Sequence, residues 1–277
     1  MKISMWSSFY SDVQPEDAVL ELEKYGYLYS ELSDEHSMLL LDRGDLFEIG
    51  KKFKVFADAH NVTFPQGHLK LSARLCEPED RQILKKQLDL FRAVGVKYAV
   101  LHTDGMTRFP DMPVEEVRQK NLEAIQDLIE HIQDTDIVIC LENINQKGIS
   151  AMVEDLLWFV DELNGEHIAI CLDTGHLNLT DDKDQARFVR VAGKHLKALH
   201  LHDNDGSGDQ HLMPSAKGQV DFQGLFSALN EIGYDELYNL EVPGEHYVHP
   251  AGYLPLKLRG IKLEYMKNLL KYYWENC

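Results

Sequence analysis

The chain has 277 residues, of which 44% are apolar, which is enough for a full core and matches the length of one α/β barrel. Its 28 basic and 46 acidic side chains give a net charge of −18, which disfavours binding to nucleic acid or anionic membranes. No apolar run approaches the roughly 20 residues that span a bilayer, and the first residues lack the apolar core of a signal peptide. We therefore expect a cytoplasmic protein that binds a small neutral molecule and a divalent metal ion.

Eight short runs of apolar or β-branched residues, mostly bounded by Gly, Asn, Asp or Pro, predict strands that are buried on both faces. They cover residues 2–7, 27–32, 62–68, 97–102, 137–142, 168–173, 196–202 and 237–242. Amphipathic segments between them predict helices at 15–24, 81–94, 114–132, 150–163, 222–232 and 257–274. Four glycines follow helical segments and are expected as helix C-caps: Gly26, Gly95, Gly165 and Gly233.

Eight successive β-then-α units predict an α/β protein built as a single (β/α)8 TIM barrel, one domain over residues 1–277. The alternative is an open doubly wound sheet, but no Gly-rich phosphate motif follows the first predicted strand. Barrel enzymes carry their chemistry at the carboxyl ends of the strands. In this chain the polar residues cluster at those ends.

Four of the predicted strand ends carry a residue type that binds metal ions: Glu142, Asp173, His200 and Glu241. A single carboxylate at such a place commonly forms a salt bridge or a helix cap. Four candidates in the fifth to eighth strands instead favour convergence on one divalent cation. Three carboxylates and one imidazole suit Mn²⁺, Co²⁺ or Mg²⁺, and Zn²⁺ is a further candidate.

Five more side chains lie at the same predicted rim and are candidates for substrate binding: His68, His102, His176, Asp209 and His211. A lone histidine is usually just hydrogen-bonded within the fold, and we keep that interpretation for His202, His246 and His249. Of these three, His202 is expected to contact a metal ligand.

A metal ion at this rim can chelate the carbonyl and neighbouring hydroxyl of a sugar and stabilise the enediolate formed when the adjacent proton leaves. Glu142 and Glu241 are the expected acid–base pair because their strands approach from opposite sides. The sequence therefore predicts a metal-dependent isomerase or epimerase of a small sugar or keto-polyol. A dehydratase or lyase acting on a keto-inositol or 3-keto sugar would use the same proton removal and stays open.

Several segments resemble the xylose-isomerase-like TIM-barrel superfamily, which includes ketose 3-epimerases, inosose dehydratase and endonuclease IV. They are residues 141–143, 172–176, 199–203, 217–222 and 239–241. The resemblance covers nearly the whole chain. It implies that the four strand-end residues bind one metal ion, usually Mn²⁺, that Glu142 and Glu241 are the acid–base pair, and that His176 contacts substrate hydroxyls.

Endonuclease IV supplies a second implication of the resemblance, because it binds three zinc ions through nine ligands. Matching residue types occur here in the same order: His68, His102, Glu142, Asp173, His176, His200, Asp209, His211 and Glu241. A second metal ion and a trinuclear zinc phosphodiesterase therefore stay open. Against the nuclease, the acidic chain shows no run of arginine or aromatic residues that would grip and bend DNA.

This chain departs from the family pattern at Pro214-Ser-Ala-Lys-Gly218, where many relatives have Pro-Gly-x-Gly in a loop that helps to frame the sugar. Only Lys70 and Lys217 are basic near the predicted rim, so we prefer an unphosphorylated substrate. A sugar-binding barrel without catalysis is disfavoured because both glutamates are present. Four aromatic residues of the last helix are expected to pack on the barrel, with a second subunit of a homo-oligomer as the alternative: Tyr265, Tyr272, Tyr273 and Trp274.

Overall fold

The computed structural model describes residues 1–145, 149–165, 167–244 and 252–277. These residues form a ring of eight strands that all run parallel to their neighbours, in the order β7-β6-β5-β4-β3-β2-β1-β8. The strands are β1 Lys2–Trp6, β2 Tyr29–Leu32, β3 Thr63–His68, β4 Tyr98–Leu101, β5 Val138–Glu142, β6 Ile168–Asp173, β7 Leu196–His200 and β8 Leu237–Leu240. The predictions for His246 and His249 lie outside the described residues.

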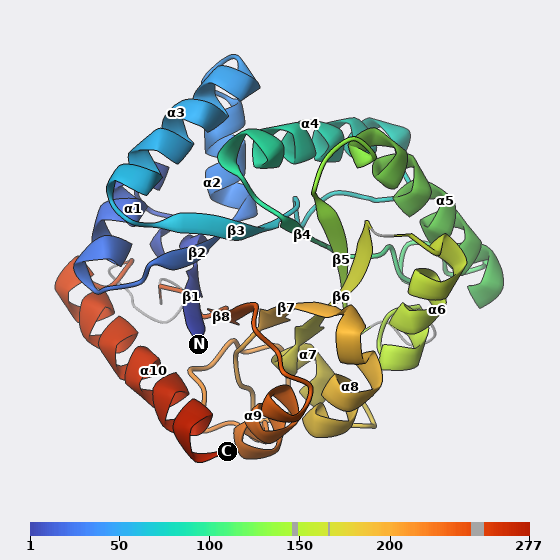
Figure 1. Ribbon diagram of the computed structural model, residues 1–277. Helices are drawn as coiled ribbons and strands as arrows, with labels where there is room; N and C mark the ends of the chain where they lie inside the picture. Colours follow the sequence, from blue (N-terminus) through green and yellow to red (C-terminus); the bar gives the residue numbers. More distant parts are fainter. Residues whose placement is uncertain (146–148, 166, 245–251) are drawn as a thin grey trace.

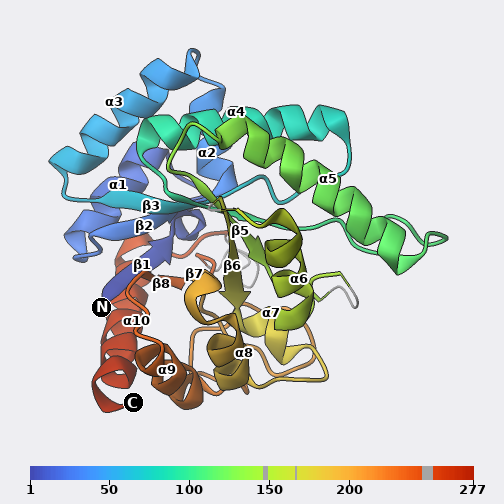
Figure 2. The ribbon, with the colours of Figure 1, turned by 45° about the vertical axis from the view of Figure 1, so that its right-hand side comes forward.

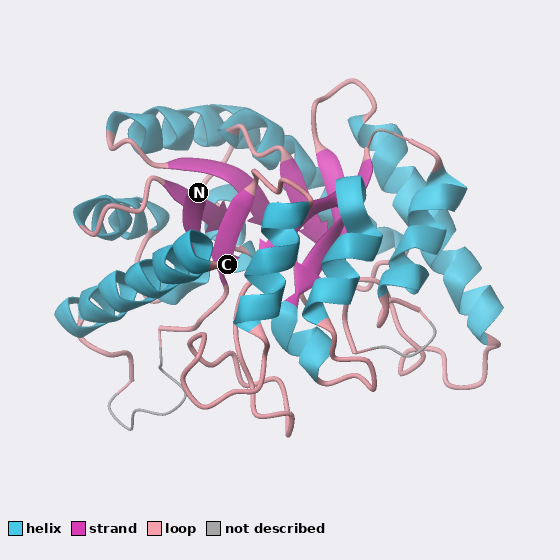
Figure 3. Ribbon diagram, turned by 60° about the horizontal axis from the view of Figure 1, so that its bottom comes forward, coloured by secondary structure: helices cyan, strands magenta, loops and turns pink. Residues whose placement is uncertain are grey.

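The ring closes between its two end strands just beyond β7. The Leu201 backbone N–H donates to the Asn239 carbonyl oxygen at 2.8 Å, and the Glu241 N–H donates to the Leu201 carbonyl oxygen at 3.2 Å. Figures 1 and 2 show the helices arranged around the outside of this ring, and Figure 3 shows the longer loops gathered at one end of it. The predicted (β/α)8 barrel is confirmed.

All six predicted helices are present, with ends that differ by a few residues. The helices are α1 Pro15–Lys24, α2 Asp34–Leu41, α3 Leu46–Ala59, α4 Pro78–Val94, α5 Val114–Ile132, α6 Val153–Leu163, α7 Thr174–Asn178, α8 Gln185–Ala192, α9 Phe222–Glu231 and α10 Leu256–Asn276. Four helices were not specified from the sequence, namely α2, α3, α7 and α8. Side-chain caps start each of them, on Ser33, Asp45, Asp173 and Asp184.

Three of the four predicted glycine caps have the left-handed backbone that glycine adopts without strain: Gly26, Gly95 and Gly233. The prediction for Gly165 is wrong. Asn164 itself takes the left-handed conformation at the end of α6, with φ 35°. Asparagine is the residue that most often replaces glycine at this place.

Inside the barrel, Cys140 and Cys171 belong to a buried apolar cluster and are free thiols. This agrees with the apolar character of a reduced thiol. On the outside, Tyr273 of α10 packs against Phe222 and Phe226, with ring centroids 6.0 and 5.5 Å away. The packing prediction is wrong for the other three aromatic residues of this helix, which are exposed: Tyr265, Tyr272 and Trp274. Within the described ranges, no helix is long and apolar enough to cross a membrane.

Candidate metal centre and pocket

The four candidate ligands meet at the carboxyl end of the barrel. Glu142, Asp173 and His200 are the last residues of β5, β6 and β7, and Glu241 directly follows β8. Because parallel strands all end at the same edge, Asp173 lies opposite His200 in the register of β6 and β7. One ligand atom from each of the four lies within 4.8 Å of all the others, and all four side chains are buried. The structure thus brings together the four residues chosen from the sequence.

Two atoms in this group are buried without any hydrogen bond, namely His200 Nδ1 and Glu241 Oε2. They face one another at 3.3 Å, and His200 Nδ1 also lies 3.2 Å from Glu142 Oε2. Buried polar atoms are nearly always paired, and unpaired ones are costly. Three carboxylates with one imidazole form a donor set suited to Mn²⁺, Mg²⁺ or Co²⁺, so the residues present fit a divalent metal ion.

The two glutamates have different acidities although both are buried. Burial raises the pKa of Glu241 to about 8, and the neighbouring carboxylates Asp173 and Glu142 add to that effect. Burial also works to raise the pKa of Glu142, but the positive charges of His200 and His102 hold it well below its usual range. Carboxyl groups whose pKa values are pushed apart in this way can act as a base and an acid at the same pH.

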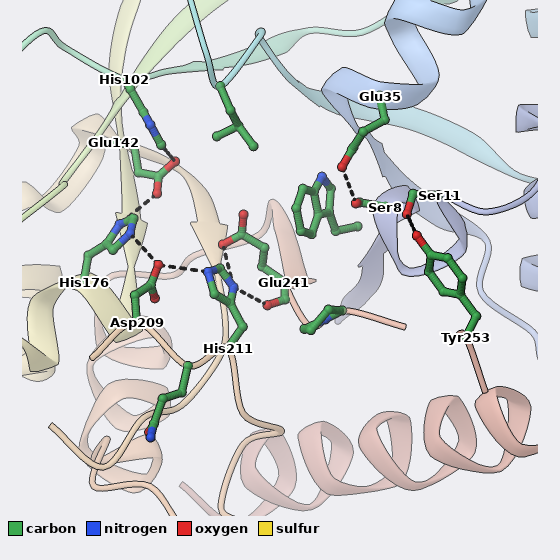
Figure 4. Close-up of a pocket in the computed structure, with 14 residues that line it drawn as sticks. Ser8, Ser11, Glu35, His102, Glu142, His176, Asp209, His211, Glu241 and Tyr253 are labelled. Atoms are coloured by element: carbon green, nitrogen blue, oxygen red, sulfur yellow. Dashed lines mark hydrogen bonds and ion pairs between the residues drawn. The ribbon is translucent and has the colours of Figure 1, made fainter. Parts of the chain in front are cut away.

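A second set of side chains extends the cluster away from the four ligands. His68 Nε2 and His102 Nε2 lie 3.3 and 3.0 Å from Glu142 Oε2, and His176 Nδ1 lies 3.1 Å from Glu142 Oε1. Asp209 Oδ2 lies 3.4 Å from His176 Nε2 and 3.1 Å from His211 Nε2, so it links these two histidines. Figure 4 shows the part of this row from His102 to His211 along one wall of the pocket.

Two further groups in the row have ligand atoms close enough to hold a metal ion. They are His68, Glu142 and His200, and His202, Asp209 and His211. The five rim residues chosen from the sequence therefore all lie in contact with the candidate metal centre or with each other. His202 Nε2 contacts Asp173 Oδ2 at 2.8 Å, the kind of contact with a ligand that the sequence suggested for it.

Carboxylates stabilise the charged form of three histidines of the row, His68, His176 and His211, whereas burial lowers the pKa of His102. Burial lowers the pKa of His211, but its bond to Asp209 and the charge of Glu241 raise it to about 10. Burial likewise opposes charge on His68, and Glu142 raises its pKa to about 9. The protein groups alone thus hold several protons in this cluster at neutral pH, and bound metal ions would displace them.

A pocket of about 580 Å³ opens above the cluster. One wall carries His102, Glu142, His176, Asp209, His211 and Glu241, and the other carries Ser8, Ser11, Glu35 and Tyr253. On the second wall, Ser8 Oγ donates to Glu35 Oε1 at 2.8 Å, and the Ser11 and Tyr253 hydroxyls are 3.1 Å apart. His68 is buried beside Glu142 and does not line the pocket.

Sequence reasoning missed the second wall. Its residues come from the 3-10 turn after β1, from the start of α2 after β2, and from the segment before α10. The same rule that found the first wall, polar residues at the carboxyl ends of strands, could have found Ser8 and Glu35. Tyr253 follows a long connection from β8 and carries no such signal.

The loop Pro214–Gly218 has a defined conformation. Asp203 accepts hydrogen bonds from the backbone N–H of Ser215 at 3.1 Å and of Val220 at 3.0 Å. Ser215 has φ 58°, a left-handed value that glycine adopts more easily than serine. A side chain at Gly218 would collide with Asp203. None of residues 214–218 lines the pocket.

A family model described as xylose isomerase-like TIM barrel matches residues 19–266. The chain belongs to this family. The resemblance inferred from the sequence is therefore confirmed, and the fold agrees with it. Membership alone leaves the reaction open, because one fold supports many activities.

Similar proteins include both epimerases and nucleases. An L-ribulose 3-epimerase of Methylomonas sp. (strain DH-1) is 30% identical over 161 residues, covering 55% of this chain and 52% of that protein. A probable endonuclease 4 of Mycoplasmopsis synoviae (strain 53) is 28% identical over 169 residues, covering 56% and 58%. The chain thus aligns with little more than half the length of these relatives.

The structure of a D-psicose 3-epimerase with D-tagatose, from Clostridium cellulolyticum H10, has the same fold over nearly its full length. The TM-score is 0.82 at 14% identity, with 99% of each chain covered. At this level of identity the likeness concerns the fold alone.

Proposed function

We propose that the protein is a metal-dependent epimerase or isomerase of a small, unphosphorylated ketose or keto-polyol. The observation that carries this proposal is that two of the four candidate ligands line the pocket and two do not. Glu142 and Glu241 also line the pocket, whereas Asp173 and His200 lie behind them. Two carboxylates that face a substrate from the same buried cluster are what proton removal and return require. The similarity to an L-ribulose 3-epimerase supports the same reaction class.

In this proposal Glu142, Asp173, His200 and Glu241 hold one divalent ion, with Mn²⁺ as the first choice. When bound, the ion polarises the substrate carbonyl and stabilises the negative oxygen of the enediolate. A further ion at the neighbouring histidines and Asp209 is a separate proposal, supported by their ligand spacing.

Glu142 is the proposed base, because its low pKa keeps it ionised. It takes the proton from the hydroxyl-bearing carbon next to the carbonyl, and the electron pair of that C–H bond moves into the enediolate. Glu241, the other candidate ligand that lines the pocket, then donates a proton to the opposite face of the same carbon. One proton leaves and one is returned, so the product is the epimer. His102, His176, Asp209 and His211 are proposed to bind substrate hydroxyls from the pocket wall.

The unphosphorylated substrate is supported by the charges of the pocket. Its described lining residues include four carboxylates and neither lysine nor arginine. Lys70 and Lys217 do not line it. A phosphate group beside the far wall would meet the Glu35 carboxylate, and the described lining has no lysine or arginine to compensate it. We also propose the cytoplasm as the site of action, because the buried cysteines are free thiols.

The test is incubation of the Mn²⁺-loaded protein with ketopentoses and ketohexoses in D₂O, followed by NMR of the products. We expect deuterium on the carbon next to the carbonyl and a mixture of two epimers. An unsaturated product would instead identify the dehydratase or lyase, since its enediolate loses a β-substituent. No exchange on any ketose or keto-inositol would contradict the proposal.

A zinc phosphodiesterase is the second candidate, favoured by one observation. All nine residues that match the endonuclease IV ligands in type and order lie in one connected cluster. Three groups of side chains there have the spacing of metal ligands: two share Glu142 and His200, and the third adds His202, which is outside the nine, to Asp209 and His211. Elemental analysis and cleavage of a duplex with an abasic site test it. Three zinc ions per chain with cleavage would favour the nuclease, and one ion without cleavage would favour the epimerase.

A further inference from the structure

Glu31 is a fully buried carboxylate that the proposed reaction does not use. It lies on β2, where it is paired in register with Gln66 of β3. It does not line the pocket, and it is absent from the four candidate ligands. A charged group with no access to water requires partners that stabilise it, so its contacts indicate its role.

Three N–H groups converge on one oxygen of this side chain. Asn239 Nδ2 donates to Glu31 Oε2 at 2.7 Å, Gln66 Nε2 donates to the same oxygen, and His200 Nε2 lies 3.0 Å from it. Two amide donors at one oxygen favour the ionised carboxylate, which only accepts hydrogen bonds. The hydrogen of the third contact must therefore belong to His200 Nε2.

The position of that hydrogen decides which nitrogen of His200 can bind a metal ion. In a neutral imidazole only one nitrogen carries a hydrogen, and the other offers its lone pair. With the hydrogen on Nε2, the lone pair is on Nδ1. His200 Nδ1 is the buried atom without a hydrogen bond, 3.2 Å from Glu142 Oε2 and 3.3 Å from Glu241 Oε2.

We propose that Glu31 is a positioning residue that fixes the Nε2–H tautomer of His200 and so directs Nδ1 at the metal ion. The inference rests on the proposed metal site. Carboxylates behind ligating histidines orient the ring and raise its strength as a ligand, and their loss typically lowers metal affinity about 10–100-fold.

A purely structural role for Glu31, as a polar link between β2, β3 and β8, is the alternative. The same buried layer contains a matched control for that role. Ser4 Oγ donates to Asn239 Oδ1 at 2.8 Å and links β1 to β8 without any described contact to His200. A variant that removes this bond perturbs the layer but leaves the contact between Glu31 and His200 in place.

The test compares Glu31→Gln, Glu31→Met and Ser4→Ala in the full-length, metal-free protein, after each is shown to fold by circular dichroism. Calorimetry gives the affinity for Mn²⁺, and NMR of ¹⁵N-labelled histidine, recorded at a pH at which His200 is neutral, gives the tautomer of His200. We expect Glu31→Met to bind Mn²⁺ about 10–100-fold more weakly and to lose the Nε2–H preference. Glu31→Gln should lie between it and the parent, because an amide oxygen accepts without a negative charge. Ser4→Ala should bind like the parent.

The inference is overturned if Glu31→Met and Glu31→Gln both retain the affinity and the tautomer of the parent, or if Ser4→Ala weakens binding equally. A parent that binds Mn²⁺ but epimerises no ketose would contradict the proposed function and leave Glu31 in its positioning role. A tautomer that changes in Glu31→Met while the parent binds no Mn²⁺ would support the link to His200 and overturn the role in metal binding.

Discussion

Glu142 and Glu241 occupy equivalent places at strand ends, yet their neighbours give them opposite proton affinities. We predict that Glu142→Gln and Glu241→Gln each lower kcat about 10²–10⁴-fold, since each removes one proton-transfer group. The two variants should differ in deuterium exchange. Glu241→Gln retains the base and still exchanges the substrate proton with solvent. For the same direction of the reaction, Glu142→Gln loses both the exchange and the epimerisation. Initial rates and NMR in D₂O measure both.

The control for this pair is Glu35→Gln. Glu35 lies on the opposite wall of the pocket, 2.8 Å from Ser8 Oγ, and has no part in the proton transfers. Its substitution should change KM more than kcat, because it removes a binding contact and leaves the acid–base pair intact. Full activity in either Glu142→Gln or Glu241→Gln would rule out the two-carboxylate mechanism.

Proton competition at Glu241 predicts how metal binding depends on pH. Its pKa is raised to about 8, so below that pH the carboxyl group holds a proton that the metal ion must displace. Burial lowers the pKa of His200, but Cys171 and the carboxylates Glu241, Glu31 and Glu142 raise it well above its usual value, so this group adds to the competition. The apparent affinity for Mn²⁺ should therefore increase as the pH rises from 6 towards about 8.

Calorimetry in buffers of different ionisation enthalpy should also detect net proton release on binding. An affinity that stays constant over this pH range, with no protons released, would contradict the assignment of Glu241 as a ligand. The magnitude of the slope gives the number of competing protons, since each contributes up to a tenfold change per pH unit.

At the scale of elements, the strand ends were predictable and the polar layer beneath them was not. Short apolar runs predict strands. The polar residue that ends a run can be identified even when the predicted strand bounds are wrong by a residue or two, and Glu142 and Asp173 were found in this way. Glu31, Gln66 and Asn239 are single polar residues inside such runs. These side chains meet because β3, β2, β1 and β8 are successive neighbours in the ring.

Helix α2 was missed for a related reason. Its second half is the continuous apolar run Met38-Leu-Leu-Leu41, which lacks the spacing of an amphipathic helix and is equally compatible with a strand. The cap on Ser33 was the remaining signal, since its side chain accepts a hydrogen bond from the His36 N–H.

Packing between β3 and α4 gives a prediction about stability. A Cβ added at Gly67 would lie 2.8 Å from Cζ of Phe91, which is fully buried on α4. Gly67→Ala should therefore lower the free energy of unfolding by about 1–3 kcal/mol, the usual cost of overpacking a core. Gly208→Ala is the control, because nothing lies within 4 Å of the added atom there. Urea unfolding measures both, and equal stabilities would contradict the close packing.

Position 67 also connects the core to the site, because it stands between Gln66 and His68 on β3. A shift of the strand to relieve the clash would move both neighbours, one of which contacts Glu31 and the other Glu142. Gly67→Ala should thus weaken Mn²⁺ binding as well as stability, whereas Gly208→Ala changes neither the strand nor its contacts.

For the whole molecule, the net charge of −18 and the carboxylates of the pocket act in the same direction on an approaching substrate. An anionic ketose phosphate is repelled, and added salt screens that repulsion, since the Debye length falls from about 30 Å at 0.01 M to about 8 Å at 0.15 M ionic strength. We predict a low kcat/KM for a ketose phosphate that rises with salt. The value for the matching neutral ketose should be higher and nearly independent of salt, because a neutral molecule experiences no net steering.

Initial rates at the two ionic strengths measure this, with potassium chloride as the added salt and the metal concentration held constant. A ketose phosphate that reacts faster than the neutral sugar, and fastest at low salt, would show that cations outside the described pocket walls govern substrate choice.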